Sequence, residues 1–268
     1  MKNKVVIITG ASSGIGKACA MQFGREGAIV VITGRTIGPL EEVAVEMRKS
    51  NIQVLAIKSD VSSEEDCKLL IEKVISIYGK VDVLINNAGI SMRALFEDID
   101  VSVIKKVMDI NFYGTVYMTK YALPYIAKSQ GSIVAMSSVA GYRGLPGRIG
   151  YSSSKFAIHG FMECLRTELL KKNVHVLLAC PGFTSSNIRK TALAADGTSQ
   201  GESPKDESSL MSAETVAHFV YDAVIKRKRN FVLTTQGKIT VFLNKLFPGF
   251  MDKMVYNHFK NEENSPLK

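Results

Sequence analysis

The chain has 268 residues, of which 46% are hydrophobic and 22% charged, and a formal net charge of +9 at pH 7. This composition excludes disordered and collagen-like chains, and no apolar run approaches the ~20 residues that span a bilayer. The positive charge suits a phosphate-bearing cofactor or an anionic membrane, and no nucleic-acid-binding motif accompanies it. The four cysteines lack metal-ligand spacing and lie in apolar contexts, so we expect core thiols and no metal. Without a secretory signal, the sequence favours a reducing cytoplasm.

Strands and helices are predicted to alternate along most of the chain, which is typical of a parallel sheet covered on both faces. Apolar runs predict the strands, and amphipathic segments predict the helices between them. The strands are expected at residues 5–9, 28–33, 54–57, 81–85, 132–136, 174–180 and 231–234. The helices are expected at residues 17–25, 40–49, 64–78, 101–127, 151–170 and 216–226.

The first predicted strand runs into a glycine-rich turn, Thr9 to Gly16, with the spacing Gly-x-x-x-Gly-x-Gly. Such a turn leaves backbone N–H groups free at the positive end of the next helix, which suits a pyrophosphate. Gly10 permits the sharp turn, Gly14 presents no Cβ to the phosphates, and Gly16 lets the helix approach the strand. Taken alone, the motif could also be a structural loop.

A serine, a tyrosine and a lysine form the clearest catalytic pattern. Tyr151 and Lys155 are four residues apart and so share one face of a helix. A neighbouring ammonium lowers the pKa of a phenol, so Tyr151 can protonate a carbonyl oxygen or deprotonate an alcohol. Ser138 would hydrogen-bond the same oxygen and fix its pose. For the Tyr–Lys pair alone, a surface tyrosine beside a solvated lysine is the alternative.

The end of the second predicted strand carries information on cofactor choice. Enzymes that use NAD place an acidic residue there, which accepts a hydrogen bond from the ribose 2′-OH. This sequence instead reads Thr33-Gly34-Arg35. Arg35 offers a planar, permanently charged fork to a 2′-phosphate. We therefore predict NADP(H) over NAD(H), with a solvated arginine as the alternative.

Together these motifs resemble the short-chain dehydrogenase/reductase family, in its compact single-domain branch. The matching residues follow the family's order over roughly the first 185 positions: Thr9 to Gly16, Asp60, Asn86 to Gly89, Asn111, Ser138, Tyr151, Lys155, Pro181 and Gly182. The resemblance implies an α/β fold with a Rossmann-type, doubly wound, seven-stranded parallel sheet in three α/β/α layers. It also implies a nicotinamide cofactor and an oxidoreductase that interconverts a ketone and a secondary alcohol.

The resemblance assigns catalytic roles to four residues. It makes Tyr151 the acid/base, has Lys155 hold the nicotinamide ribose, and has Ser138 orient the substrate. Asn111 would hold a water that links Lys155 to solvent, and a buried amide that bonds to backbone is the alternative for this residue.

The resemblance also implies which residues bind the cofactor. They are Gly10, Ser12, Ser13, Gly14, Ile15, Gly16, Arg35, Asp60, Val61, Asn87, Ala88, Gly89, Tyr151, Lys155, Pro181, Gly182 and Thr184. Asp60 and Val61 would contact the adenine, and Thr184 would hold the carboxamide. The alternatives are a helix cap near Asp60 and a helix or loop cap at Thr184.

We predict a dinucleotide-binding and catalytic domain over residues 1–235, with a polar substrate lid, or a plain surface loop, at 185–212. A C-terminal amphipathic helical extension is expected at 236–268. Its apolar residues recur at helical spacing among lysines, so it could pack on the body, pack across a dimer, or rest on a membrane. Residues 261–268 are predicted to fray.

The sequence therefore predicts an NADP(H)-dependent reductase of an apolar or lipid-like carbonyl. The resemblance implies a homodimer or homotetramer that associates through the helices that hold Asn111 and Tyr151. The alternatives are a 3-oxoacyl-type reductase and a non-catalytic NADP(H)-binding regulator. The presence of Ser138, Tyr151 and Lys155 argues against the regulator.

Overall fold

The computed structural model describes residues 1–203, 206–262 and 264–268. In these residues a parallel sheet of seven strands has the order β3-β2-β1-β4-β5-β6-β7. The strands are β1 Val5–Thr9, β2 Ile29–Gly34, β3 Val54–Lys58, β4 Val83–Asn86, β5 Ser132–Met136, β6 His175–Cys180 and β7 Asn230–Val232. The main helices are α1 Gly14–Arg25, α2 Ile37–Lys49, α3 Glu64–Tyr78, α4 Val101–Met108, α5 Gly114–Ser129, α6 Ile149–Glu168, α7 Ala213–Ile225, α8 Thr235–Leu246 and α9 Pro248–Lys260.

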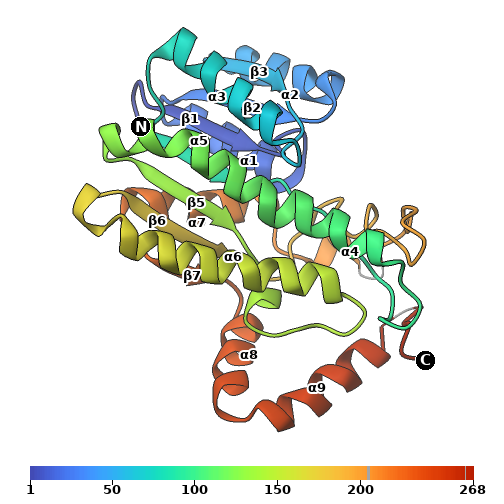
Figure 1. Ribbon diagram of the computed structural model, residues 1–268. Coiled ribbons are helices and arrows are strands. Elements are labelled where there is room, and N and C mark those ends of the chain that lie inside the picture. Colours follow the sequence, from blue (N-terminus) through green and yellow to red (C-terminus); the bar gives the residue numbers. More distant parts are fainter. Residues whose placement is uncertain (204–205, 263) are drawn as a thin grey trace.

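Helices cover both faces of the sheet and produce three layers (Figure 1). The side chains of β1 alternate between two buried clusters, as the pleat of a strand requires. Val6 and Ile8 join the cluster formed with α1, α2 and α7, whereas Val5 and Ile7 join the cluster formed with α3, α5 and α6. Both faces are therefore apolar, which explains why the strands are continuous apolar runs.

Strand order reverses beside β1, because β2 pairs with one edge of this strand and β4 with the other. In a doubly wound sheet, this reversal opens a crevice at the carboxyl ends of the strands, where ligands bind. The predicted Rossmann-type fold is confirmed. The polar residues that follow β1, β2, β4 and β5 consequently meet along one edge of the sheet.

Several boundaries differ from the sequence prediction. The helix α2 begins at Ile37, so Pro39 lies in its first turn rather than at its start. The long helix or helix pair predicted at about 101–127 consists of α4, a π-helical turn Asp109–Tyr113 and α5. Ser63 caps α3, since its hydroxyl accepts from the Asp66 N–H. Cys164 is exposed, so the expectation of core thiols fails at this cysteine.

The C-terminal extension packs on the body of the protein. Met251, Val255 and Phe259 on one face of α9 are buried in a cluster that also includes Leu145. The predicted frayed tail is wrong in part, because Glu262 and Ser265 are buried. The Ser265 hydroxyl donates to the Phe259 carbonyl at 2.6 Å, and this bond returns the chain to the end of α9. Among the described residues, no helix is long and apolar enough to cross a bilayer.

Candidate active site

The glycine-rich turn joins β1 to α1 and leaves the start of this helix open. The N-cap residue Ser13 makes no side-chain capping bond, and the first turn of α1 carries no acidic residue. Gly10 has φ +63°, and a Cβ there would lie 2.8 Å from the Ala88 Cα. A Cβ at Gly14 would meet only Ser186, at 3.5 Å. The helix N-terminus is thus accessible to an anion such as a pyrophosphate, which fits a dinucleotide.

The side chain of Asn87 supports this turn from β4. Its Nδ2 donates to the Thr9 carbonyl at 2.9 Å and to the Gly10 carbonyl at 3.0 Å. The Thr9 hydroxyl in turn accepts from the backbone N–H groups of Asn87 and Ala88. A Cβ at Gly16 would lie 2.5 Å from the Asn87 Nδ2, so this glycine is required by the close packing. The predicted cofactor residues Ser12 and Ile15 belong to the same turn and helix start.

The predicted adenosine residues follow β2 and β3. Arg35 is exposed, and among the described residues no hydrogen bond or ion pair engages its guanidinium. One carboxylate oxygen of Asp60, Oδ1, accepts from the Ser62 N–H and hydroxyl, so Asp60 stabilises the turn before α3. Val61 is buried in the core beside Gly114. Asp60 therefore has a structural role in this turn, and the contacts of Asp60 and Val61 with the adenine stay predictions.

Ser138, Tyr151 and Lys155 line one cavity of about 330 Å³. Ser138 follows β5, while Tyr151 and Lys155 lie one turn apart on α6. The Lys155 Nζ donates to the Met136 carbonyl at 2.8 Å and lies 5.5 Å from the centre of the Tyr151 ring. The hydroxyls of Ser138 and Tyr151 are hydrogen-bonded. The three predicted catalytic side chains are therefore brought together by the fold.

Burial controls the protonation of this group. It raises the pKa of Tyr151, although the hydrogen bond from Ser138 opposes the shift. Burial also lowers the pKa of the Lys155 ammonium to about 8. The pKa of Tyr151 is therefore raised, not lowered as expected from the neighbouring lysine, because desolvation of the phenolate is the largest effect. At neutral pH the phenol keeps its proton and can donate it to an acceptor in the cavity.

Asn111 lies in the π-helical turn between α4 and α5 and is fully buried. Its Oδ1 accepts from the Ile90 N–H at 2.8 Å, and its Nδ2 donates to the Ile90 carbonyl and to the Ser154 hydroxyl. The side chain thus bonds to backbone, which was the alternative interpretation. It fixes the loop after Gly89, where a Cβ would lie 3.2 Å from the Asn111 Oδ1.

The cavity joins predicted cofactor residues to residues that the sequence did not single out. Ile15, Asn87, Gly89, Pro181, Gly182 and Thr184 line it together with the catalytic group. Further lining comes from the lid and from α9, through Ile188, Arg189, Met254, Val255, His258 and Phe259. The helical spacing of apolar residues predicted the extension, but nothing in that pattern could show that one face of α9 forms a cavity wall.

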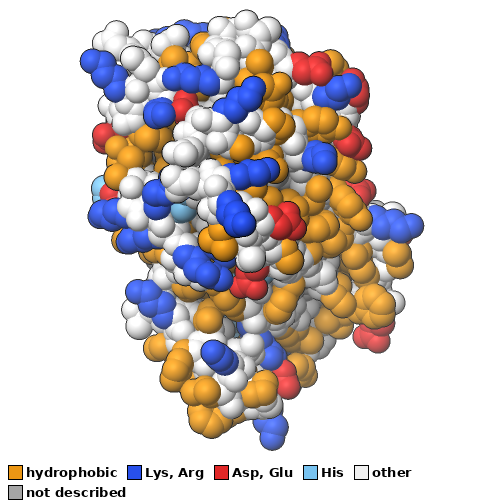
Figure 2. Space-filling model, turned by 60° about the vertical axis from the view of Figure 1, so that its left-hand side comes forward, with side chains coloured by type: hydrophobic (Ala, Val, Ile, Leu, Met, Phe, Trp, Pro, Cys, Tyr) orange, Lys and Arg blue, Asp and Glu red, His pale blue; other side chains and the backbone are white. Residues whose placement is uncertain are grey.

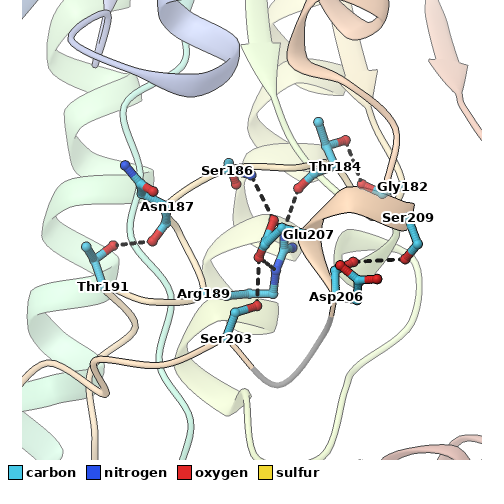
Figure 3. Close-up of polar contacts among 10 residues, drawn as sticks. All are labelled: Gly182, Thr184, Ser186, Asn187, Arg189, Thr191, Ser203, Asp206, Glu207 and Ser209. Carbon is cyan, nitrogen blue, oxygen red and sulfur yellow. Dashed lines mark hydrogen bonds and ion pairs between the residues drawn. The ribbon is translucent and has the colours of Figure 1, made fainter.

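Hydrogen bonds connect the two ends of the lid (Figure 3). The Arg189 guanidinium donates two bonds to the Glu207 carboxylate, each at 2.6 Å, and a third to the Thr184 carbonyl. The bond from Arg189 lowers the pKa of Glu207 to about 2, with burial opposing the shift. Glu207 also accepts from the Ser186 N–H and the Ser203 hydroxyl. The predicted lid is therefore fastened at its base, and its residues 204 and 205 lie outside the described residues.

Comparisons with known proteins agree with this geometry. A family model described as short chain dehydrogenase matches residues 4–197. Dehydrogenase/reductase SDR family member 7B of Mus musculus is 37% identical over 271 residues, which cover 99% of this chain and 84% of that protein. The 11-beta-hydroxysteroid dehydrogenase 1A of Arabidopsis thaliana is 42% identical over 187 residues, 69% of this chain and 53% of that protein. A short-chain dehydrogenase/reductase structure from Burkholderia phymatum, in complex with NAD, shares the fold with a TM-score of 0.83 at 23% identity, covering 93% of this chain and 95% of that one.

Proposed function

Because this chain belongs to the short-chain dehydrogenase family, we propose that it is an NADP(H)-dependent reductase that converts an apolar ketone to a secondary alcohol. The observation that carries the proposal is the cavity shared by Ser138, Tyr151 and Lys155. This cavity is continuous with the predicted dinucleotide site at one end, and α9 provides an apolar wall.

The side chains of the cavity are suited to proton transfer at a carbonyl oxygen. When bound, a reduced nicotinamide supplies the hydride that adds to the carbonyl carbon. Tyr151 donates its phenolic proton to the oxygen, and the Ser138 hydroxyl holds this oxygen within reach. The Lys155 ammonium stabilises the phenolate that remains until a proton from solvent replaces the one given up. The net change is one hydride and one proton added across the C=O bond.

The preference for NADP(H) rests on Arg35. This exposed guanidinium follows Gly34 at the carboxyl end of β2, where a carboxylate would select the 2′-OH of NAD. A guanidinium instead binds a phosphate through paired hydrogen bonds. Reduction is the favoured direction, because cells usually hold NADP pools reduced.

The substrate proposal rests on the apolar side chains around the catalytic group. Leu145, Met254, Val255 and Phe259 line the end of the cavity formed by the extension. Such a wall would bury a hydrocarbon body next to Tyr151 while the carbonyl points at its hydroxyl. A relative named as a hydroxysteroid dehydrogenase agrees with an apolar ketone.

We also propose that the junction of α8 and α9 contacts an anionic membrane. Figure 2 shows hydrophobic side chains gathered at the lower end of the molecule, where Figure 1 places this junction. Phe242, Leu246, Phe247 and Phe250 are each more than half exposed there. Lys238, Lys245 and Lys253 lie on the same two helices and could pair with lipid phosphates. Liposome flotation tests this proposal, and the replacement of Phe247 and Phe250 by Ser should abolish association if it holds.

Association with a second copy is proposed through α5 and α6, as the family resemblance suggests. Tyr113, just before α5, and Ile149 and Phe156 on α6 are exposed apolar residues on the outer face of this layer. Sedimentation of the full chain would distinguish a monomer from a dimer or tetramer.

Oxidation of NADPH, followed by absorbance, tests the proposed function across ketones graded from small polar to long-chain and steroidal. Turnover should rise with apolar size and should be lost in Tyr151→Phe, whereas Tyr121→Phe on the exposed side of α5 serves as the matched control. A preference for 3-oxoacyl thioesters would favour the 3-oxoacyl-type reductase. Tight NADPH binding without turnover of any carbonyl would favour the non-catalytic regulator.

A further inference from the structure

A half-buried histidine lies behind the catalytic group and takes no part in the proposed proton transfer. His159 is one helical turn beyond Lys155 on α6. Its Nε2 lies 2.8 Å from the Ser137 Oγ, in a hydrogen bond whose direction depends on the imidazole tautomer. The same nitrogen lies 3.7 Å from the Cys180 Sγ. One imidazole therefore contacts the residues at the carboxyl ends of two strands.

These two contacts lie where two loops of the site begin, one after β5 and one after β6. Ser137 follows β5, and its N–H donates to the Ala179 carbonyl of β6 at 2.7 Å. The next residue after Ser137 is Ser138, which hydrogen-bonds Tyr151. The next residues after Cys180 are Pro181 and Gly182, which line the cavity. His159 therefore joins the loop that orients the substrate to the loop predicted to face the nicotinamide.

The ring of His159 is held in place by close packing on the loop after β5. Its centre lies 4.4 Å from the centre of the Tyr142 ring, at an interplanar angle of 78°. A Cβ at Gly141 would lie 2.4 Å from the His159 Nε2, so only glycine admits the imidazole here. Gly141 itself donates to the Ser138 carbonyl at 3.0 Å. Movement of the imidazole would therefore be transmitted to the turn that begins at Ser138.

The cluster is uncharged at neutral pH. Burial and, to a smaller extent, the nearby Lys155 ammonium lower the pKa of His159 to about 4. Burial raises the pKa of the Cys180 thiol to about 12, against hydrogen bonds from Ser137, Tyr142 and the Ser138 backbone. A neutral imidazole and a neutral thiol can bond to the loops without placing a second cation beside Lys155.

We propose that His159 is a positioning residue that couples the Ser138 loop to the Pro181-Gly182 loop and so sets the geometry of proton transfer. Its kinetic consequence rests on the proposed reductase function, whereas the coupling of the loops does not. A displacement of about 1 Å at a reacting group can cost a factor of roughly 100 in rate, so loss of the coupling should strongly lower the rate of reduction.

His175 offers a matched control at the other end of the same two strands. It is buried, and its ring nitrogens lie 3.0 Å from the Ser132 Oγ and 2.8 Å from the Lys228 carbonyl. Replacement of either histidine by leucine removes an imidazole and its bond to a serine of the β5 region. Only His159→Leu removes these contacts next to the site.

Amide hydrogen exchange of the full chain, with and without NADPH, tests the coupling without any substrate. In His159→Leu, segments 137–142 and 181–184 should exchange faster together, while His175→Leu should leave both unchanged. His159→Gln, which keeps a polar partner for Ser137, should restore part of the protection. If His159→Leu protects both loops as well as the original chain does, the proposal is overturned.

Kinetics of ketone reduction tests the consequence. In His159→Leu, kcat should fall about 10- to 100-fold with little change in KM, and His175→Leu should match the original chain. The combined Ser137→Ala and His159→Leu variant should lose no more kcat than the more affected single variant, because both changes break the same pathway. Strictly multiplicative losses would overturn the proposed route through Ser137. If the original chain reduces no ketone, but both loops exchange faster together in His159→Leu, the proposed function fails and the coupling stands.

Discussion

Glu262 and Arg148 form a buried ion pair that joins the segment after α9 to the start of α6. The Glu262 Oε2 lies 2.9 Å from an Arg148 guanidinium nitrogen and 3.6 Å from one of Arg93. Arg148 is the N-cap residue of α6, and its guanidinium carbon lies 4.6 Å from the centre of the Phe259 ring. The wall that α9 contributes to the cavity is therefore tied to the helix that carries Tyr151.

Replacement of Glu262 by Gln should loosen this wall. The substitution removes the negative charge that faces the guanidinium groups of Arg148 and Arg93. The free energy of unfolding should fall by about 2–3 kcal/mol, which should lower Tm by roughly 4–10 °C. For an apolar ketone, kcat/KM should fall about tenfold, and the Kd of NADPH should not change. Asp252→Asn is the matched control, because Asp252 pairs with Arg143 from the exposed side of α9. Equal kcat/KM in the two variants would contradict the account.

Replacement of Arg35 by Asp should invert the cofactor preference. The carboxylate would repel the 2′-phosphate and accept from a 2′-OH, so the Kd of NADPH should rise at least about tenfold while that of NADH falls. Fluorescence titration with both dinucleotides measures the change. Arg25→Asp, at the distant end of α1, is a control for the altered net charge. Unchanged NADPH affinity in Arg35→Asp would remove the basis of the NADP(H) proposal.

The rate of reduction should decline above about pH 8. Burial lowers the pKa of Lys155 to about 8, so the ammonium loses its proton as the pH rises through this value. Tyr151 has a raised pKa and stays protonated over the same range. The free energy of unfolding changes in the opposite direction. The unfolded chain binds the Lys155 proton more tightly than the folded chain does, so the folded chain becomes more stable as the pH rises above about 8. A profile of kcat/KM that stays level to pH 10 would be inconsistent with this assignment.

The Arg189–Glu207 pair should control cofactor affinity through Thr184. Glu207→Gln removes the charge that holds Arg189, and Arg189 in turn holds the Thr184 carbonyl. A loss of about 1.4 kcal/mol would raise the Kd of NADPH about tenfold. Asp196→Asn is the control, since the Asp196 carboxylate accepts from the Thr198 N–H and hydroxyl in an exposed turn of the lid. Equal affinities in the two variants would show that the pair does not support Thr184.

Local patterns predicted the fold because the central strands β1, β4, β5 and β6 are buried on both faces. The apolar runs of β1 and β5 could be read with correct bounds, and so could the capped helix α3. The π-helical turn at Asn111 could not, because its backbone bonds depend on contacts with Ile90 and Ser154 that lie far away in sequence. The predicted start of α2 at residue 40 is also wrong, because the helix begins at Ile37 and accepts Pro39 in its first turn.

The catalytic group was predictable because Tyr151 and Lys155 are fixed by helical spacing and Ser138 by its place after a strand. The roles of His159, Arg148 and Glu262 were not, because each acts on residues that only the tertiary fold brings near. A lone histidine and a lone glutamate carry no pattern. The chain end looked frayed for the same reason, since its anchoring partners lie more than a hundred residues earlier.

Transfer of deuterium from NADPH that carries deuterium at both C4 positions of the nicotinamide tests the central claim most directly. The alcohol formed from an apolar ketone should carry one deuterium at the carbinol carbon, detected by mass spectrometry, and Tyr151→Phe should form little labelled product although it binds NADPH. Absence of the label from the alcohol, or equal labelling by Tyr151→Phe, would contradict hydride transfer assisted by the Tyr151 proton.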